Sequence, residues 1–218
     1  MKIISIDGGI GSGKSTIIEA LKKEDPDGFI FVLEPIHLWD TIMDEDGNTM
    51  LQLFYANKLK YGFTFQMMTY ESRLVLLREA IEQNPNAIII TERSLDTDRH
   101  VFAKMLHDDG LIEDVCMQIY LKWFDHFIKD INVENVIYID ATPEKCLERI
   151  HTRSRPGEEL VELSYLSRCE EYYKDMLTKY PESNSLMIDG NIDYDEEGKI
   201  LKSRLNDIVQ FCRSVGNS

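Results

Sequence analysis

A glycine-rich run near the N-terminus contains the residue types that proteins use to bind phosphate. Positions 8–16 fit the pattern G-x-x-x-x-G-K-[ST] and are Gly8, Gly9, Ile10, Gly11, Ser12, Gly13, Lys14, Ser15 and Thr16. Glycines allow close approach of the backbone, so successive N–H groups can surround phosphate oxygens at the start of a helix. Lys14 supplies a positive charge to the β- and γ-phosphates, and the Ser15 hydroxyl can ligate Mg²⁺. Because an apolar stretch precedes the run and a helical pattern follows it, the sequence predicts a nucleotide-binding protein.

Carboxylates follow two later apolar runs, where each predicted strand ends. Glu34 comes after the run 29–33, and Glu92 and Arg93 come after the run 87–91. Ligands of open α/β sheets bind at the carboxyl ends of the strands, so we expect both carboxylates to face the phosphate-binding loop. There a carboxylate can accept a proton from an attacking hydroxyl or hold the ligand shell of Mg²⁺, and Arg93 can neutralise charge on the transferred group. The residues predict phosphoryl transfer and leave open which carboxylate takes the proton.

A polar stripe lies on a predicted helix that is otherwise apolar. Gln66, Thr69 and Arg73 are spaced by three and four residues and therefore share one side of that helix. Burying such a stripe is costly without partners, and the Gln66 amide offers a donor and an acceptor to the edge of a nucleobase. The alternative is a helix with one face in water.

Arginines gather after the fourth predicted strand. Arg149 and Arg153 lie four residues apart, where like charges on one helix cost about 0.2–0.5 kcal/mol, and Arg155 follows. In a chain short of cations this concentration predicts an anion-binding segment, with a solvated basic helix face as the alternative. Together with Lys14 and Arg93, these arginines predict a basic pocket inside an acidic molecule.

Short apolar runs that alternate with helical patterns must position these residues. The runs are rich in Ile, Val and Phe without polar alternation, as in strands covered on both faces, and span residues 3–7, 29–33, 87–91, 135–140 and 185–189. The alternation predicts a parallel sheet with right-handed crossovers and helices on both faces. Residues 1–218 contain no internal repeat and no Pro/Gly-rich linker, so we expect a single α/β domain.

The segment 114–131 is predicted to be a helix that is apolar on two sides. Its two adjacent rows are Val115, Ile119, Trp123, Phe127 and Ile131, and Cys116, Tyr120, Phe124 and Ile128. Such a helix is expected to be buried, in the core or at a subunit interface.

The composition excludes several classes of protein. The 218 residues include 24 Lys+Arg and 39 Asp+Glu, and the net charge of −15 disfavours a protein that wraps duplex nucleic acid. An apolar content of 43% excludes disorder as the dominant state. No run approaches the roughly 18 consecutive apolar residues of a membrane span. The four cysteines lack metal-site spacing, which indicates reduced thiols and a cytoplasmic location.

Several segments, in order along the chain, resemble the deoxyribonucleoside kinase family. They are GGIGSGKST, EPIHLW beginning at Glu34, FTFQ downstream of Tyr55, ERSLDTDRHVF beginning at Glu92, ATPEKCLERIHTRSR and EELVELSYL. The resemblance covers nearly the whole chain. It implies the three-layer fold of a P-loop kinase, with a five-stranded parallel sheet and an arginine-rich lid at about 149–160. It also implies Mg²⁺- and ATP-dependent phosphorylation of the 5′-hydroxyl of a deoxyribonucleoside, for nucleotide salvage.

The resemblance implies roles for the residues at the strand ends. Glu34 is expected to contact the 5′-hydroxyl as general base, and Arg93 to bridge the 5′-oxygen and the phosphates. Glu92 is expected to accompany Mg²⁺ together with Ser15, and it is also a candidate for the proton acceptor. Lys14 completes the catalytic set.

The same resemblance implies the contacts of the nucleoside. They are Tyr55 and Glu158 at the 3′-hydroxyl, Trp39 and Phe102 beside the base, and Gln66, Arg73 and Asp98 at its edge. The pairing of Arg73 with Asp98 resembles that of the cytidine and purine kinases, which favours deoxycytidine or a purine deoxynucleoside over thymidine. Thr69 stands where those kinases are expected to have Ala or Ser, so the base stays open.

The donor side and the assembly follow from the resemblance as well. Arg149, Arg153 and Arg155 are expected to close over ATP as the lid, and Tyr194 to contact its adenine. The segment 114–131 is expected to join two copies of the chain into a homodimer.

Other functions fit the residues less well. A thymidylate-type monophosphate kinase needs an Arg before the Glu-Pro dipeptide and an Asp-Arg-Tyr after the third strand, where this chain has Leu33 and Glu92-Arg93-Ser94. A kinase-like binding subunit without activity would be indicated by loss of Lys14, Glu34 or Glu92, and all three are present. A GTPase switch would need an NKxD-type segment, which the sequence lacks.

Overall fold

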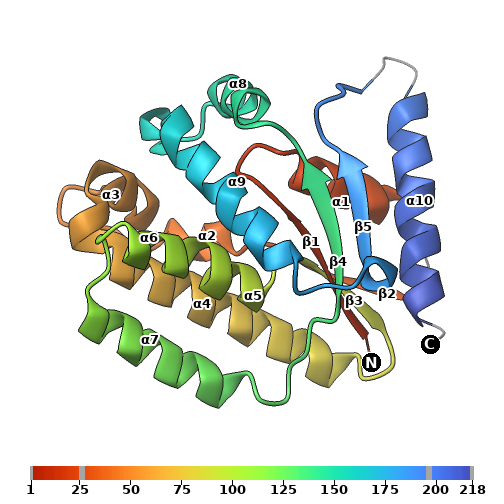
Figure 1. Cartoon of the computed structure of the whole chain (residues 1–218), viewed down its shortest axis with the longest axis horizontal. Coiled ribbons are helices and arrows are strands. Elements are labelled where there is room, and N and C mark those ends of the chain that lie inside the picture. The colour runs from red at the N-terminus through yellow and green to blue at the C-terminus, as the bar shows by residue number, and fades with distance from the viewer. Residues whose placement is uncertain (1, 25–27, 195–197, 217–218) are drawn as a thin grey trace.

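The computed structural model describes residues 2–24, 28–194 and 198–216 and shows a five-stranded sheet in the order β2-β3-β1-β4-β5 (Figure 1). All neighbouring strands pair in parallel, and the predicted fold class is confirmed. The strands are β1 (Lys2–Gly8), β2 (Phe29–Val32), β3 (Ile88–Glu92), β4 (Asn135–Asp140) and β5 (Ser185–Asp189). Each coincides with a predicted run to within one residue at either end.

Helices connect the strands. They are α1 (Lys14–Lys23), α2 (Ile36–Trp39), α3 (Met50–Ala56), α4 (Lys58–Gln83), α5 (Leu95–Thr97), α6 (Lys104–Asp108), α7 (Asp114–Phe127), α8 (Pro143–Arg153), α9 (Leu163–Leu177) and α10 (Lys199–Gly216). A π-helical turn, η1 (Asp98–Ala103), joins α5 to α6, and the 3₁₀ turns η2 (Glu158–Leu160) and η3 (Glu182–Asn184) flank α9.

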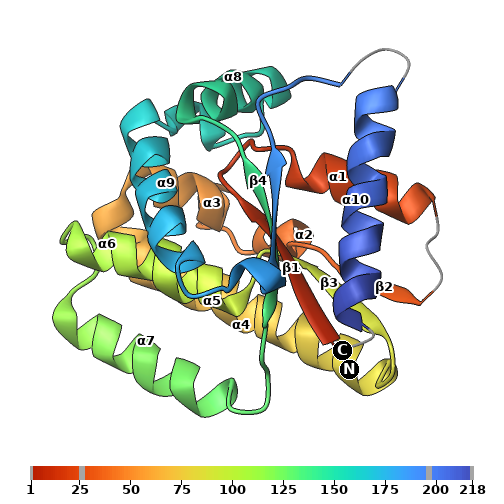
Figure 2. The ribbon, with the colours of Figure 1, turned by 45° about the vertical axis from the view of Figure 1, so that its right-hand side comes forward.

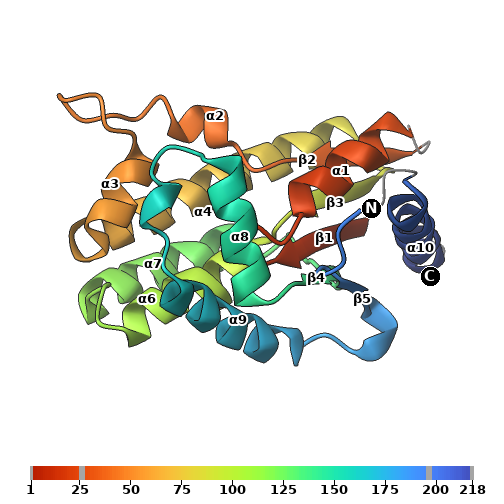
Figure 3. The ribbon, with the colours of Figure 1, turned by 90° about the horizontal axis from the view of Figure 1, so that it is seen from above.

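The helices form a layer on each face of the sheet. Helices α1 and α10 cover one face, and α4, η1 and α9 cover the other (Figures 2 and 3). Ile4 and Ile6 of β1 are fully buried and pack with Ile17 of α1 and Ile208 of α10. Burial on both faces explains why the strands lack polar alternation.

Helix α4 carries the predicted polar stripe on its buried side. Gln66, Thr69 and Arg73 are 2%, 5% and 2% exposed, which excludes the alternative of a face in water. Asn57 caps the start of the helix, because its side chain accepts a hydrogen bond from the Lys60 amide at 3.0 Å.

Helix α7 ends at Phe127, earlier than predicted, and only one of its two apolar rows is buried. Tyr120 and Phe124 are in the core, whereas Val115, Ile119, Trp123 and Phe127 are 58%, 44%, 46% and 42% exposed. The reason is that α7 forms an outer layer against α4, away from the sheet (Figure 1). A place in the core is therefore wrong for this exposed row. Within the described ranges, no helix has the length and apolar content needed to cross a membrane.

Candidate functional site

A cavity of about 660 Å³ lies at the carboxyl edge of the sheet, between the start of α1, α4, η1 and the α8–η2 turn. It brings together most of the predicted site residues. Those that line it are Ile10, Gly11, Gly13, Lys14, Ser15, Thr16, Glu34, Trp39, Tyr55, Gln66, Arg73, Glu92, Arg93, Asp98, Phe102, Arg149, Arg153, Arg155 and Glu158. Gly8, Gly9, Ser12 and Tyr194 are not among its lining residues.

The glycine-rich run connects β1 to α1 as predicted. Gly13 precedes the helix with a φ of 101°, in the region that favours glycine, and the positive end of the helix dipole therefore lies at the cavity. The Lys14 ammonium donates to the carbonyl oxygens of Gly8 and Gly9, at 2.9 and 2.7 Å. Burial and the nearby charge of Arg93 lower the pKa of Lys14 to about 8.

Ser15, at the end of this loop, is in contact with Glu92. The Ser15 hydroxyl donates to Glu92 Oε1 at 2.6 Å. Parallel pairing of β3 with β1 sets Glu92 beside Ile6, two residues before the loop begins, so the strand end delivers the carboxylate to the start of α1. Both oxygens are of the kind that can ligate a divalent cation.

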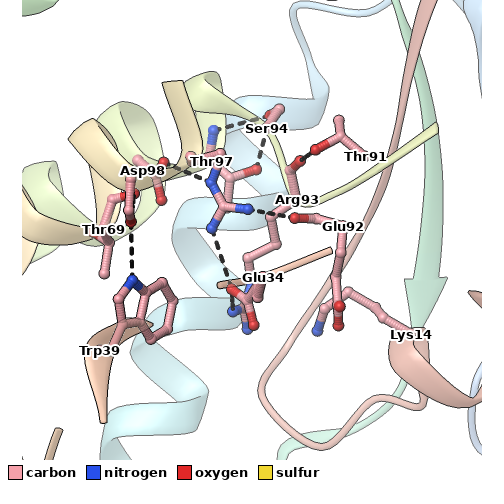
Figure 4. Close-up of polar contacts among 12 residues, drawn as sticks. Lys14, Glu34, Trp39, Thr69, Thr91, Glu92, Arg93, Ser94, Thr97 and Asp98 are labelled. Carbon is pink, nitrogen blue, oxygen red and sulfur yellow. Dashed lines mark hydrogen bonds and ion pairs between the residues drawn. The ribbon is translucent and has the colours of Figure 1, made fainter. Parts of the chain in front are cut away.

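Glu34 accepts ion pairs from two buried arginines (Figure 4). Arg73 Nη2 lies 3.2 Å from Glu34 Oε1, and Arg93 Nη1 bonds the same oxygen. Burial alone would raise the pKa of Glu34, but the charges of Arg93, Arg73 and Lys14 outweigh it and lower the pKa to about 2. Glu34 is therefore an ionised carboxylate at neutral pH, at the centre of the cavity.

Arg93 is held in a backbone conformation that arginine rarely adopts. Its φ is 61°, which costs on the order of 1–3 kcal/mol and persists only where the surroundings fix it. Its amide donates to the Ile6 carbonyl at 3.0 Å, its Nε donates to the Tyr173 hydroxyl at 3.2 Å, and its guanidinium lies 5.0 Å from the centre of the Phe102 ring. No local sequence signal predicts this conformation.

The end of the cavity away from the glycine-rich loop is lined by aromatic rings and by a few polar side chains. Arg73 Nε donates to Asp98 Oδ2 at 2.9 Å, which is the predicted pair. Among the residues that the structure describes, the buried Gln66 Oε1 has no hydrogen-bond partner, so it is available to a ligand. The Trp39 indole donates to Ser72 Oγ at 2.9 Å and meets Phe65 edge to face. Phe65 also lines the cavity, and the sequence did not predict it as a site residue.

The arginines after β4 are engaged with protein groups. Arg149 Nη1 donates to the Gly190 carbonyl at 2.7 Å, and Nη2 pairs with Asp193 at 2.8 Å. Arg153 and Arg155 both pair with Glu158, at 2.7 and 3.2 Å. The α8–η2 turn thus joins two predicted ATP-binding residues to a predicted sugar-binding residue.

The cavity is not basic. It is lined by six cationic side chains and seven carboxylates, so the prediction of a basic pocket is wrong as a statement of net charge. The physical reason is that buried cations require partners, and here the partners are carboxylates of the same cavity.

Tyr194 packs away from the cavity. Its ring contacts the buried cluster between the sheet, α1 and α10, and the Arg204 guanidinium lies 5.4 Å from the ring centre. Its neighbour Asp193 lines the cavity instead. Contact between Tyr194 and adenine would need this segment to rearrange, and it stays a prediction.

Sequence reasoning missed a buried carboxyl directly beneath the loop. Asp7 of β1 is fully buried and accepts a hydrogen bond from the Thr97 hydroxyl, next to Asp98. Burial raises its pKa. The signal available in the sequence was an acidic residue at the end of an isoleucine-rich run.

A parallel α/β sheet with this glycine-rich loop at its carboxyl edge defines the class of P-loop nucleotide-binding proteins. The sequence profile of the deoxynucleoside kinase family matches residues 4–213, and the chain belongs to this family. The predicted family and the predicted enzyme, a deoxynucleoside kinase with ATP as phosphate donor, are confirmed. The thymidylate-type kinase and the inactive binding subunit are not supported.

Several relatives align over most of the chain. A fowlpox virus (strain NVSL) protein named "Probable deoxycytidine kinase" is 32% identical, over 98% of this chain and 89% of its own. Human deoxycytidine kinase is 30% identical, over 95% of this chain and 85% of its own. The mitochondrial deoxyguanosine kinase of Xenopus laevis is 29% identical, over 82% of this chain and 74% of its own.

Proposed function

We propose that this kinase phosphorylates the 5′-hydroxyl of deoxycytidine or of a purine deoxynucleoside in preference to thymidine. The observation that carries the proposal is the ionised, buried Glu34 between the glycine-rich loop and the aromatic end of the cavity. An uncharged hydroxyl suits a carboxylate there, whereas an acceptor phosphate would be repelled by it.

The polar edge of the cavity supports the base preference. The unpartnered Gln66 Oε1 is an acceptor, and the exocyclic amino group of a base is one donor that can bond it. Cytosine, adenine and guanine carry such a group, and thymine does not. Asp98, held by Arg73, is a second acceptor on the same side. The relatives named as deoxycytidine and deoxyguanosine kinases agree with this preference.

In the proposed mechanism, Glu34 orients the 5′-hydroxyl and receives its proton. A carboxylate with a pKa of about 2 is a weak base, so the proton moves late, when most of the new O–P bond has formed. Arg93 bonds Glu34 and is positioned to neutralise charge on the moving phosphoryl group. Tyr55 and Glu158 hold the 3′-hydroxyl, and Trp39 and Phe102 enclose the base.

Ser15 and Glu92 fit the Mg²⁺ that accompanies ATP, because they place two oxygen donors 2.6 Å apart beside the phosphate-binding loop. When bound there, Mg²⁺ would neutralise charge on the phosphates of ATP. This contact supports Glu92 as the cation's carboxylate and Glu34 as the proton acceptor in the proposal. Lys14 and the loop amides receive the phosphates, and Arg149, Arg153 and Arg155 close over them as a lid at about 149–160.

The assembly and location form part of the proposal. We propose one domain over residues 1–218, a homodimer through α7, and a cytoplasmic enzyme that binds neither nucleic acid nor membrane. The exposed apolar row of Val115, Ile119, Trp123 and Phe127 supports the dimer.

Turnover of Mg²⁺-ATP with a panel of acceptors tests the function. The panel comprises deoxycytidine, deoxyadenosine, deoxyguanosine, thymidine and their 5′-monophosphates. We expect phosphorylation of the nucleosides, with thymidine the poorest, because its base lacks the amino group that Gln66 would bind. Activity on monophosphates alone would overturn the proposal, and a preference for thymidine would overturn its assignment of the base.

The same assay tests the role of Glu34. Glu34→Gln keeps the size of the side chain but removes its charge, and we expect kcat to fall by about 10²-fold or more. Turnover at the wild-type rate in this variant would contradict the assignment of the proton to Glu34.

A further inference from the structure

Glu158 is bonded by two arginines at once. Arg153 donates from Nε to Oε2 at 3.1 Å and from Nη2 to Oε1 and Oε2 at 2.8 and 2.7 Å, while Arg155 Nη1 donates to Oε1 at 3.2 Å. These four bonds match the roughly four acceptor positions that a carboxylate offers. The Glu158 side chain is only 4% exposed, so water does not readily replace an arginine that leaves.

The turn that contains this cluster is docked against α3. Gly157 has a φ of 92°, and a Cβ at this position would lie 3.0 Å from Gln52 Cγ and 3.1 Å from Gln52 Cα. Tyr55, on the same helix α3, lines the cavity, and burial followed by the charge of Glu158 raises the pKa of its hydroxyl. Glu158 is therefore fixed at the end of the cavity proposed for the nucleoside. The arginines that bond it belong to the segment proposed to close over ATP.

We propose that Glu158 couples the two substrate sites, so that a nucleoside and ATP each strengthen the binding of the other. This inference rests on the proposed function. A sugar hydroxyl that donates to Glu158 must displace an arginine bond, because the acceptor positions are filled. The displaced guanidinium is then free to bond a phosphate oxygen, which is an equally good charge-assisted acceptor.

If the triphosphate binds first, it strengthens the binding of the nucleoside in the same way. A triphosphate that draws Arg153 and Arg155 away leaves a buried carboxylate without its partners, and a sugar hydroxyl relieves part of that cost. Thermodynamic linkage requires that the two effects have equal size. Glu158 thus acts on the arginines as a positioning residue, in addition to its contact with the sugar.

Calorimetric binding tests the coupling without turnover. The Kd of deoxycytidine is measured with wild-type enzyme alone and with saturating Mg²⁺ and β,γ-methylene-ATP, a non-hydrolysable analogue. We expect the Kd to fall by about 5-fold or more, the usual lower range for coupled sites. With 2′,3′-dideoxycytidine, which lacks the 3′-hydroxyl, we expect the Kd not to change.

Two variants complete the test. Glu158→Gln weakens the arginine bonds, so the analogue is expected to leave the Kd of deoxycytidine unchanged. Glu159→Gln, the same change at the exposed neighbouring residue, should keep the wild-type coupling. Equal coupling in wild type and Glu158→Gln, or none in wild type, overturns the proposal.

If the acceptor panel identifies another nucleoside, that nucleoside and its dideoxy form replace the cytidines. If no nucleoside is phosphorylated, the proposed function fails instead.

Discussion

Individual charged groups in the cavity owe their protonation states to their partners. Glu34 is ionised because Arg93 and Arg73 bond it, and the burial that would otherwise neutralise it makes those bonds stronger. Removing one member of such a buried pair commonly costs about 3–5 kcal/mol, because the other charge is left without a partner. The residues with the proposed chemical roles therefore also hold the site together.

Lys14 gives a prediction that depends on pH. Its pKa of about 8 in the free enzyme means that the ammonium loses its proton as the pH rises through 8, and the neutral amine cannot attract phosphates. We therefore expect kcat/KM for ATP to decline above about pH 8 and to approach a tenfold loss for each further pH unit. Steady-state kinetics between pH 6.5 and 9.5 measure this decline.

An internal control comes from kcat/KM for the nucleoside at saturating ATP. Bound phosphates stabilise the Lys14 cation, so the decline should move to higher pH in that profile. A kcat/KM for ATP that stays constant to pH 9.5 would contradict the combination of a lowered Lys14 pKa and a phosphate contact made by its ammonium.

At the level of elements, the glycine-rich loop is packed against the helix that carries the arginines. A Cβ at Gly11 would lie 2.5 Å from the Cys146 carbonyl oxygen and 3.1 Å from Ile150 Cγ1, both on α8. Arg149, also on α8, donates to the Ser12 carbonyl at 3.3 Å. The loop and α8 are therefore in direct contact, and part of this contact is made by backbone atoms.

This packing predicts the effect of Gly11→Ala. The substitution places a methyl group into backbone atoms and strains a φ of 83°, so we expect a lower Tm and at least a tenfold weaker affinity for ADP. Gly47→Ala is a matched control, because Gly47 has a φ of 82° and a Cβ there would meet nothing within 4 Å. Thermal unfolding and calorimetry measure both variants. Equal ADP affinity in the two would mean that the contact with α8 is unimportant.

For the whole molecule, the arrangement of the outer layer determines what is left exposed. The cavity lies at the carboxyl edge of the sheet. Helix α7 lies in the outer layer (Figure 1), and four of its large apolar side chains are exposed. Trp123 and Phe127 of this row stack on each other, with ring centres 5.8 Å apart. A row of this kind is more typical of an interface than of a free surface.

The proposed dimer predicts that Trp123→Glu halves the molar mass in solution, because a charge in a buried apolar interface is costly. Light scattering at micromolar concentration measures this mass. Met187→Glu is the control, since Met187 is 54% exposed and belongs to β5, an edge strand of the sheet, and not to α7. A dimer that survives Trp123→Glu, or a monomeric wild type, contradicts the proposed role of α7.

The sequence by itself determined the order of the strands along the chain, the glycine-rich loop and the carboxylates at the strand ends. These features depend on neighbours a few residues apart, on apolar runs and on helix spacing, which are local. Apart from the pair of Arg73 with Asp98, which the family resemblance implied, only the tertiary structure decided which charges meet. Glu34 bonds arginines 39 and 59 positions away in the sequence, and those pairings turned an expected basic pocket into a balanced one. The strained backbone of Arg93, the exposed row of α7 and the two arginines on Glu158 likewise arise from packing between elements, which no local pattern encodes.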